Sequence, residues 1–397
     1  MSEKTDNKVP NVPNLRFDKS ELWHTELLSK YAKKITLKNK NNLIENIICN
    51  SAQNGLIQQK DFFDRTIVNN ENTENYYVIE QGDFVYNPRK SVTAPYGPVN
   101  VYEYTNSGIV SPLYLCFKVD GIDKRFLNYY FKSSAWYKYI YENGDSGARH
   151  DRVSIKDDVF LAQPIIVPHL TTQDKIASFL SKIDQRIETQ SKIIEDLELV
   201  KKGIYNHIFT QLNSVEKILL EDFLIDFNKR TVADKQYPIL SSTLSGIYLQ
   251  EDYFNKQAAS ASTEGYKIVP YGFATYRSMS DTGEFRFNLQ TIVENGIVSP
   301  AYPVFTCIEG HRLDFILFCL NYYDDIKKQL FTMKQGGTRL ALHFNSLCKL
   351  YIPQINKEKQ SKIMAIVNSY NDKIVVEKQI LEKLKEQKKF LLSNMFI

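Results

Sequence analysis

Apolar residues recur at alternating steps of four and three along residues 173–209. This is the heptad spacing of a helix that packs against another helix along one seam. No proline interrupts the stretch, and its only glycine is Gly203. The pattern predicts a helix of about 50 Å at a rise of 1.5 Å per residue. The seam positions are Ile176, Leu180, Ile183, Ile187, Gln190, Ile194, Leu197, Lys201, Ile204 and Ile208.

The same pattern returns, aligned without a gap, along residues 360–396. Its polar breaks, Glu377 and Lys388, stand where the first copy has Gln190 and Lys201. A repeat of this length indicates two copies of one structural unit. The seam positions of the second copy are Ile363, Val367, Tyr370, Ile374, Glu377, Leu381, Leu384, Lys388, Leu391 and Met395.

The polar breaks predict how the two helices pair. A parallel pair in register would set Lys201 against Lys388, and two cations in an apolar seam are costly. An antiparallel pair can set Lys201 against Glu377 and Gln190 against Lys388, with apolar layers around them. We therefore expect an intramolecular antiparallel coiled coil in that register. The alternative is two unrelated amphipathic surface helices, which leaves the matched breaks unexplained.

The segments before the two helices also repeat each other. Gly-Ile-Val-Ser-Pro occurs intact at 108–112 and at 296–300, SGAR (146–149) matches GGTR (336–339), and Tyr86 recurs as Tyr276. Short β-like runs alternate with turn residues in both segments. The fold class is thus mixed α/β (α+β), with two similar domains in tandem. The expected organisation is a flexible tail (1–14), a first domain (15–170), a long helix (171–214), a second domain (215–356) and a C-terminal long helix (357–397).

One shorter helix is expected inside the first domain, over residues 123–142. Its periodicity makes Phe126, Tyr129, Tyr130 and Trp136 candidate core residues. Most loop residues differ between the two domains although their frames match. Two similar frames with different loops suggest two related binding surfaces with different targets.

The composition excludes few classes of protein, but it indicates the cellular compartment. Lys and Arg total 50 against 46 Asp and Glu, so a basic patch is permitted but not required. The five cysteines lack paired or metal-like spacing, and no apolar run approaches the length that spans a bilayer. The polar N-terminus lacks the apolar centre of a signal peptide. We expect a cytoplasmic protein.

Catalytic signatures are missing from the sequence. It contains no GxGxxG or GxxxxGK phosphate loop, no HExxH and no CxxC pair, and its six histidines are scattered. The run Asp281-Thr282-Gly283-Glu284 brings two carboxylates together, but no basic partner follows at nuclease-like spacing, so we interpret it as a turn. No catalytic residue and no metal site is expected in this chain.

The order of these parts resembles the specificity (S) subunit of type I restriction–modification systems over nearly the whole chain. The features that carry the resemblance are VPNLRF (12–17), the paired GIVSP segments, the SGAR and GGTR turns, and Gln-x-Lys-Ile at 173–176 and 360–363 after a strand that ends in proline.

The resemblance implies two target-recognition domains, each of which reads one half of a split DNA sequence. It implies that the long helices set the spacer and dock two modification (methyltransferase) subunits, and that restriction (endonuclease/translocase) subunits join them in host defence. Adenine methylation and ATP-dependent cleavage would then belong to those partners, with S-adenosylmethionine, ATP and Mg as their cofactors and none in this chain.

Base readout needs hydrogen-bonding side chains on loops, with Arg suited to guanine and Asn or Gln to adenine. Lys90, Arg152, Arg286 and Lys334 are expected to meet phosphates. Each cation could instead be a solvated surface charge or part of an internal salt bridge. The candidate DNA-binding residues are Tyr86, Asn87, Arg89, Lys90, Gly147, Arg149, Arg152, Tyr276, Arg277, Arg286, Lys334, Gly337 and Arg339.

Other functions remain open from the sequence. A stand-alone DNA-binding regulator would bind specific DNA tightly without partners. A protein–protein scaffold would show no salt-dependent DNA affinity. An undetected catalytic activity would require a carboxylate or histidine cluster that only folding assembles. The DNA target and its spacer length do not follow from the sequence.

Overall fold

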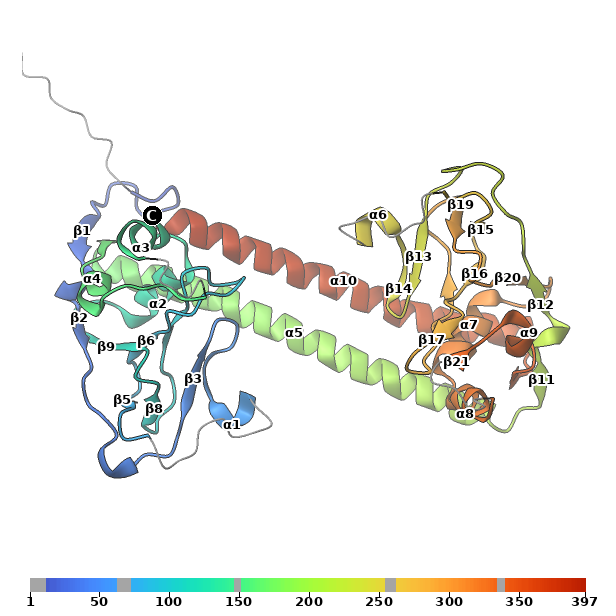
Figure 1. The fold of residues 1–397 in the computed structure, drawn as a ribbon, viewed down its shortest axis with the longest axis horizontal. Helices are drawn as coiled ribbons and strands as arrows, with labels where there is room; N and C mark the ends of the chain where they lie inside the picture. Colours follow the sequence, from blue (N-terminus) through green and yellow to red (C-terminus); the bar gives the residue numbers. More distant parts are fainter. Residues whose placement is uncertain (1–11, 63–72, 146–150, 254–261, 334–339) are drawn as a thin grey trace, which may run out of the picture. The chain divides into compact units, whose positions relative to one another are not determined.

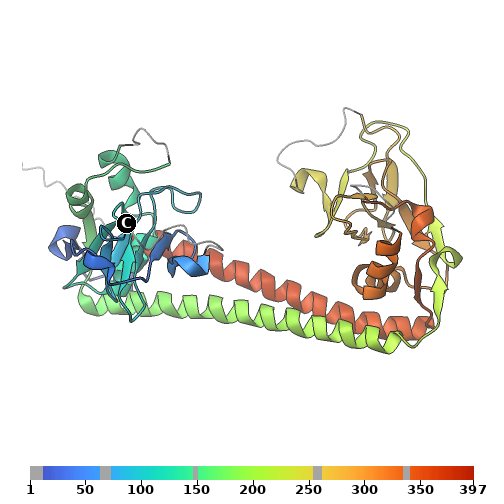
Figure 2. The same ribbon diagram turned by 60° about the horizontal axis from the view of Figure 1, so that its bottom comes forward.

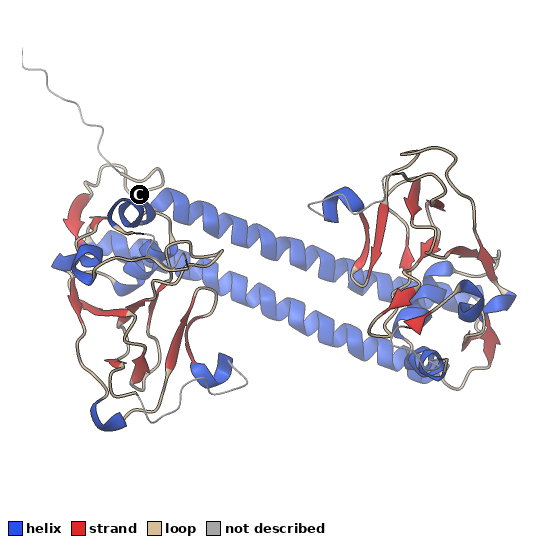
Figure 3. Ribbon diagram, viewed as in Figure 1, coloured by secondary structure: helices blue, strands red, loops and turns tan. Residues whose placement is uncertain are grey.

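The computed structural model describes residues 12–62, 73–145, 151–253, 262–333 and 340–397, which divide into two compact units (Figure 1). Unit 1 comprises Met1–Lys192 with Gln379–Ile397, and unit 2 comprises Ile193–Lys378. Two long helices, α5 (Leu170–Leu212) and α10 (Lys357–Met395), each contribute residues to both units. Figure 3 shows that each unit combines strands and short helices with a stretch of the two long helices.

Unit 1 is built from short antiparallel strand pairs around one larger sheet. The four-stranded sheet has the order β2 (Ala32–Lys34), β9 (Leu115–Val119), β6 (Phe84–Tyr86), β7 (Val99–Val101). The pairs are β1 (His24–Leu27) with β10 (Pro164–Val167), β3 (Ile48–Ser51) with β4 (Gly55–Gln58), and β5 (Tyr77–Ile79) with β8 (Gly108–Val110). The shorter helices are α1 (Gln59–Phe62), α2 (Lys124–Lys132), α3 (Tyr137–Asn143) and α4 (Asp157–Leu161).

Unit 2 repeats this plan and adds one strand pair, β17 with β21. Its four-stranded sheet has the order β12 (Leu224–Asp226), β20 (Val304–Cys307), β16 (Ala274–Thr275), β18 (Asn288–Leu289). The pairs are β11 (Lys217–Leu219) with β22 (Tyr351–Pro353), β13 (Leu240–Thr243) with β14 (Gly246–Leu249), β15 (Lys267–Pro270) with β19 (Asn295–Val298), and β17 (Met279–Ser280) with β21 (Leu340–Ala341). The shorter helices are α6 (Gln250–Tyr253), α7 (Leu313–Tyr322), α8 (Asp324–Thr332) and α9 (Phe344–Leu347).

The predicted mixed fold with two similar domains and two long helices is confirmed. The single helix predicted over 123–142 is wrong, because the chain breaks into α2 and α3. Ser133 leaves the helix in an extended conformation, and its hydroxyl donates to the Tyr130 carbonyl at 2.6 Å. The turn lets the Trp136 indole donate to the Phe131 carbonyl at 3.1 Å. All four core residues proposed for this segment are buried.

The core of unit 1 combines distant parts of the chain. Its buried cluster includes Phe126 and Tyr130 of α2, Ile183 of α5, and Leu391 and Phe396 from the other end of the sequence. The Phe396 ring centroid lies 5.3 Å from that of Phe126 and 6.3 Å from that of Tyr130. The last turn of α10 therefore completes the core that the first domain begins.

Unit 2 uses the repeat partner of Phe396 in the same way. The Phe209 ring stacks 4.8 Å from Phe318 of α7 and 5.0 Å from Tyr323. Fully burying an aromatic side chain contributes about 1.5–3 kcal/mol of hydrophobic stabilisation. Each domain is thus anchored to the end of one long helix by an equivalent phenylalanine.

Within each unit, α5 and α10 lie side by side in opposite directions (Figures 1 and 2). In unit 2, Glu198 pairs with Lys378 at 2.9 Å, and seven residues later along α5 the Tyr205 hydroxyl donates to Asn371 at 3.2 Å. Partner numbers that fall on one helix as they rise on the other define an antiparallel pair. Every seam position predicted from the heptad pattern is buried or half-buried.

The two lysines of the seam are neutralised in a way the sequence did not predict. Lys201 pairs with Glu198 of its own helix at 2.7 Å, and Glu198 also binds Lys378. Lys201 therefore lies beside the turn of α10 that contains Glu377, but its carboxylate partner is Glu198.

Lys388, the second seam lysine, binds Asp184 of α5. The Asp184 carboxylate also accepts a hydrogen bond from the Tyr129 hydroxyl at 2.8 Å. Burial raises the pKa of Tyr129, and the hydrogen bond to Asp184 raises it further.

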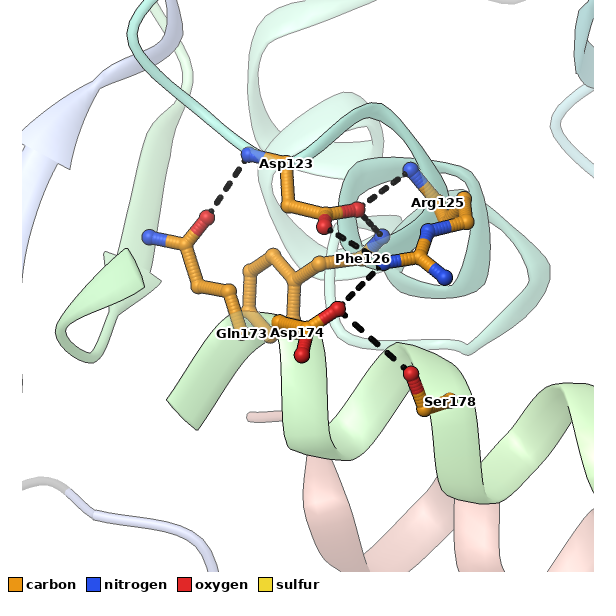
Figure 4. Close-up of polar contacts among 6 residues, drawn as sticks. All are labelled: Asp123, Arg125, Phe126, Gln173, Asp174 and Ser178. Carbon is orange, nitrogen blue, oxygen red and sulfur yellow. Dashed lines mark hydrogen bonds and ion pairs between the residues drawn. The ribbon is translucent and has the colours of Figure 1, made fainter. Parts of the chain in front are cut away.

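The repeated Gln-x-Lys-Ile motif closes the junction between each domain and its long helix. Gln173 and Asp174, at the start of α5, face the first turn of α2 (Figure 4). Asp123 caps α2 by accepting from the backbone N–H groups of Arg125 and Phe126, and Asp174 binds the Arg125 guanidinium at 2.5 Å. A side-chain acceptor at a helix N-cap contributes about 1 kcal/mol.

The glycines of the two GIVSP segments are required by close packing. A Cβ on Gly108 would lie 2.7 Å from Ile48 Cγ1 and from the Tyr102 hydroxyl oxygen, and a Cβ on Gly296 would overlap Leu240. Real Cβ atoms do not approach neighbours so closely. The repeated glycine thus lets β8 and β19 lie against the neighbouring hairpins.

Of the helices that the structure describes, none is long and apolar enough to cross a membrane.

Candidate nucleic-acid interface

A cleft of about 260 Å³, cleft 1, opens in unit 1 where β3 and β6 end and the turn after β8 begins. The repeated GIVSP segment supplies part of its wall, with Ser111 directly after β8. Its lining includes Asn50, Asn87, Arg89, Ser111, Tyr114 and Arg152.

Cleft 2, of about 690 Å³, occupies the equivalent position in unit 2, where β13 and β16 end and the turn after β19 begins. Ser299 and Tyr302 stand where cleft 1 has Ser111 and Tyr114. Its lining also includes Gln250, Arg277, Asp281, Glu284 and Arg286.

In each unit an amide of the four-stranded sheet bonds to the hairpin that lines the cleft. In unit 1, Asn100 of β7 donates to the Asn50 side chain at 2.7 Å. In unit 2, Asn288 of β18 donates to Ser242 at 2.8 Å and to the Thr243 carbonyl at 2.9 Å. Buried polar groups that are satisfied in this way rigidify their surroundings. The frames of the clefts are therefore fixed, while the loops at their mouths differ.

The candidates of unit 1 separate into structural and available side chains. The Asn87 amide donates to the Asn50 carbonyl at 3.1 Å, and its Oδ1 accepts from the Arg89 backbone at 3.0 Å, so Asn87 shapes the turn. Arg89 and Arg152 are neighbours, since segments 88–90 and 151–153 exchange backbone hydrogen bonds. The Arg89 side chain is 67% exposed, and its contact with Asp151 is long, at 3.9 Å. Lys90 is half-buried at the same edge.

In unit 2, Arg277 and Arg286 line the same cleft but differ in availability. Arg277 is exposed, and its guanidinium makes no ion pair or hydrogen bond with a described residue. Arg286 donates to the Tyr322 hydroxyl at 2.8 Å, and its guanidinium lies 4.9 Å from the centre of that ring. Arg286 therefore packs against Tyr322, and its contact with a phosphate stays a prediction.

Tyr86 and Tyr276 need a second correction. Their side chains are 2% and 0% exposed, and their hydroxyls donate to the carbonyls of Tyr96 and Leu342. Burial raises the pKa of both phenols. A buried side chain with a satisfied hydroxyl has no atom for a base edge, so both tyrosines are core residues that position the loops after them.

Five other candidates, Gly147, Arg149, Lys334, Gly337 and Arg339, lie outside the described residues. Their assignment stays a prediction.

The sequence reasoning passed over several residues that line the clefts. Tyr114 and Tyr302 follow the two GIVSP segments at the same spacing, so the repeat itself could have indicated them. The sequence predicts Glu284 only as part of a turn. The turn is confirmed, because the Gly283 N–H donates to Ser280 Oγ at 3.0 Å and Gly283 has a φ of +83°. It presents Glu284 at the cleft.

Nothing in the described part of the chain suggests a metal-dependent site. Among those residues, no group of three or more His, Cys, Asp or Glu side chains could hold a metal ion. All five cysteines are free thiols. The clefts therefore offer hydrogen-bond donors and acceptors on a rigid frame, which suits recognition of a polar surface.

Part of the chain matches a known protein family in sequence. Residues 25–199 match the family described as type I restriction modification DNA specificity domain.

The S subunit of the type I restriction–modification system from M. genitalium has a similar fold. Its TM-score is 0.56 at 15% identity, and the likeness covers 97% of this chain and 99% of that one. A chain from a structure described as the basis of complex assembly and conformational transition of the type I R-M system also has a TM-score of 0.56, at 11% identity, over 93% of this chain and 96% of that one. Both likenesses concern the fold.

Proposed function

We propose, from the match of residues 25–199 to a type I restriction modification DNA specificity domain, that the two units of this chain read the two halves of one split DNA sequence. Unit 1 reads one half through cleft 1, and unit 2 reads the other through cleft 2. The protein serves sequence specificity, and catalysis belongs to partner subunits.

One observation carries the proposal. Cleft 1 and cleft 2 occupy equivalent positions on repeated frames, yet they present different side chains. Sequence readout requires polar side chains at base edges, and two half-sites of different sequence require two different sets. A duplicated frame with unlike loops meets both requirements.

The coiled coil is proposed to set the unread gap between the half-sites. Sites on one face of B-DNA recur about every 34–36 Å, or one helical turn. Helices of 43 and 39 residues, at a rise of 1.5 Å per residue, are long enough to serve as such a spacer.

The proposed partners follow from the same family match. The exposed faces of α5 and α10 are proposed to dock two modification (methyltransferase) subunits, and restriction subunits complete an ATP-dependent endonuclease. S-adenosylmethionine, ATP and Mg act in those partners, and the methylated base is adenine. A solved structure of similar fold is described in terms of complex assembly of the type I R-M system, which supports an assembly of this kind.

The test is to sequence the methylated bases of DNA from cells that co-express this chain with its cognate modification subunit. Cells with the modification subunit alone are the control. We expect a new motif of two short blocks around a fixed gap, with methyladenine in each block. Unchanged methylation, with the subunits shown to be folded and assembled, would overturn the proposal and favour a scaffold role.

A further inference from the structure

We propose that cleft 2 reads a G·C pair in its half-site, with Arg277 donating to guanine and the Glu284 carboxylate accepting from the cytosine amino group. This assignment rests on the proposed function and deepens it, because it names one base pair of a half-site and the two side chains that recognise it.

The state of the two side chains is the first argument. Both are exposed, and both line cleft 2. Neither the Arg277 guanidinium nor the Glu284 carboxylate makes an ion pair or a hydrogen bond with a described residue. A free cation and a free carboxylate in one cleft leave a donor fork and an acceptor for a ligand.

The chemistry of DNA narrows what that ligand is. A carboxylate near the phosphates is repelled by them, so it weakens binding unless it finds a donor. In the major groove the donors are the amino groups of cytosine and adenine, and Glu or Asp pairs characteristically with cytosine N4. Arg pairs with the guanine O6 and N7 acceptors. Arg277 together with Glu284 therefore matches the two edges of a G·C pair.

The fold fixes the backbone beside both side chains. Arg277 follows Tyr276, which is fully buried and bonded to the Leu342 carbonyl. Glu284 follows the Ser280–Gly283 turn, and its backbone N–H donates to Thr282 Oγ1 at 3.3 Å. The backbone is thus anchored beside Arg277 and beside Glu284. A fixed backbone reduces the conformational entropy that is lost on binding, which favours specific contacts.

Cleft 1 provides a contrast within the same molecule. Of the described residues that line it, none is acidic, and its cations are Arg89 and Arg152. The carboxylate reader is thus a property of cleft 2, and its removal should alter only one of the two half-sites.

The experiment compares the methylated motif of the wild-type chain with that of Glu284→Gln, in cells that co-express the modification subunit. Gln keeps the size of the side chain but can both donate and accept, so it distinguishes cytosine poorly from other bases. We expect one C·G position in one block to lose about tenfold in selectivity, with the other block unchanged. Arg277→Ala should relax the same position.

Glu309→Gln is the matched control, because Glu309 is an exposed carboxylate of unit 2 outside the lining of cleft 2. It should leave the motif unchanged. If Glu284→Gln keeps the motif and only tightens DNA binding at all sequences, Glu284 is a solvated charge and the inference is wrong. A relaxed position that is not G·C also overturns it. If the wild-type chain yields no motif, the proposed function fails instead.

Discussion

Gln173 Oε1 accepts a hydrogen bond from the backbone N–H of Asp123 at 2.9 Å (Figure 4), and its Nε2 donates to the Pro168 carbonyl at 2.9 Å. In unit 2, Gln360 makes the equivalent bonds to Arg312 and Ile355, both at 2.9 Å. One buried amide in each unit thus ties the start of a long helix to the start of a domain helix.

Replacing Gln173 by Ala should therefore lower the free energy of unfolding by about 1–3 kcal/mol, since two backbone groups lose their partner. Urea denaturation of the full chain measures the loss. Gln185→Ala, at an exposed position of α5, should change stability by about 0.5 kcal/mol or less. Equal effects of the two substitutions would show that the buried amide does not stabilise the junction.

Tyr276→Phe tests whether this residue is structural. The change removes a buried hydroxyl and leaves the Leu342 carbonyl without its donor, which should cost about 1–2 kcal/mol. The methylated motif should not change. Tyr271→Phe, at an exposed tyrosine of the same unit, should alter neither. A changed methylated motif at unchanged stability would show that Tyr276 contacts DNA.

Gly296→Ala and Gly203→Ala should have opposite effects. The first places a Cβ against Leu240, and overpacking of this kind costs about 1–3 kcal/mol. The second lies in the interior of α5 with no atom within 4 Å of the new Cβ, and Ala is favoured over Gly there by about 0.5–1 kcal/mol. Thermal unfolding of the two variants decides the matter. Destabilisation by both would contradict the packing argument for the repeated glycine.

Glu198 should give unit 2 a pH-dependent contribution. Hydrogen bonds from Lys201 and Lys378 lower the pKa of Glu198. A carboxyl whose pKa is lower in the folded state stabilises above its unfolded pKa, and this stabilisation is lost as the pH falls through the folded value. Because Glu198 is 37% exposed, solvent screening should keep the contribution below about 1 kcal/mol.

The stability advantage of the wild-type chain over Glu198→Gln should therefore be present at about pH 7 and shrink below about pH 4. Urea denaturation at both pH values provides the comparison. Glu195→Gln, at an exposed position of the same helix, should show no such trend. A stability advantage of the wild-type chain that grows as the pH falls would contradict the lowered pKa of Glu198.

Helix length should set the unread gap in the DNA target. A seven-residue insertion in both α5 and α10 keeps the heptad phase and adds about 10.5 Å at 1.5 Å per residue. The gap in the methylated motif should lengthen by about three base pairs, at 3.4 Å per step. The same insertion in α5 alone should abolish methylation, since the seam loses its register. An unchanged gap in the double insertion would show that the helices do not measure the spacer.

The long helices and the tandem repeat were predictable because both signals are local or periodic. A seam at heptad spacing appears in the sequence itself, and a repeated Gly-Ile-Val-Ser-Pro needs no knowledge of contacts. The break at Ser133 was missed because an apolar period continues across it. Only the capping geometry, with the Trp136 indole bound to a carbonyl, ends the helix there.

The candidate site was less predictable, since the availability of a side chain depends on residues far away in the sequence. Arg286 binds Tyr322, and Asn87 binds the backbone at Asn50, so part of the hydrogen-bonding capacity of each side chain is already used. Tyr86 and Tyr276 stand beside loops in the sequence, but their rings are buried in the core. The repeat predicted two related binding surfaces, whereas long-range packing decided which side chains they present.

The packing of Phe396 against Phe126 and Tyr130 also sets an order of folding. Unit 2 is a continuous segment, Ile193–Lys378, so all of its residues leave the ribosome before those of Gln379–Ile397. Unit 1 needs Leu391 and Phe396 to cover its aromatic core. The domain that is synthesised first is therefore the last to be finished. A nascent chain cut short before Leu391 would lack Leu391 and Phe396, and the aromatic core of unit 1 would be left partly uncovered.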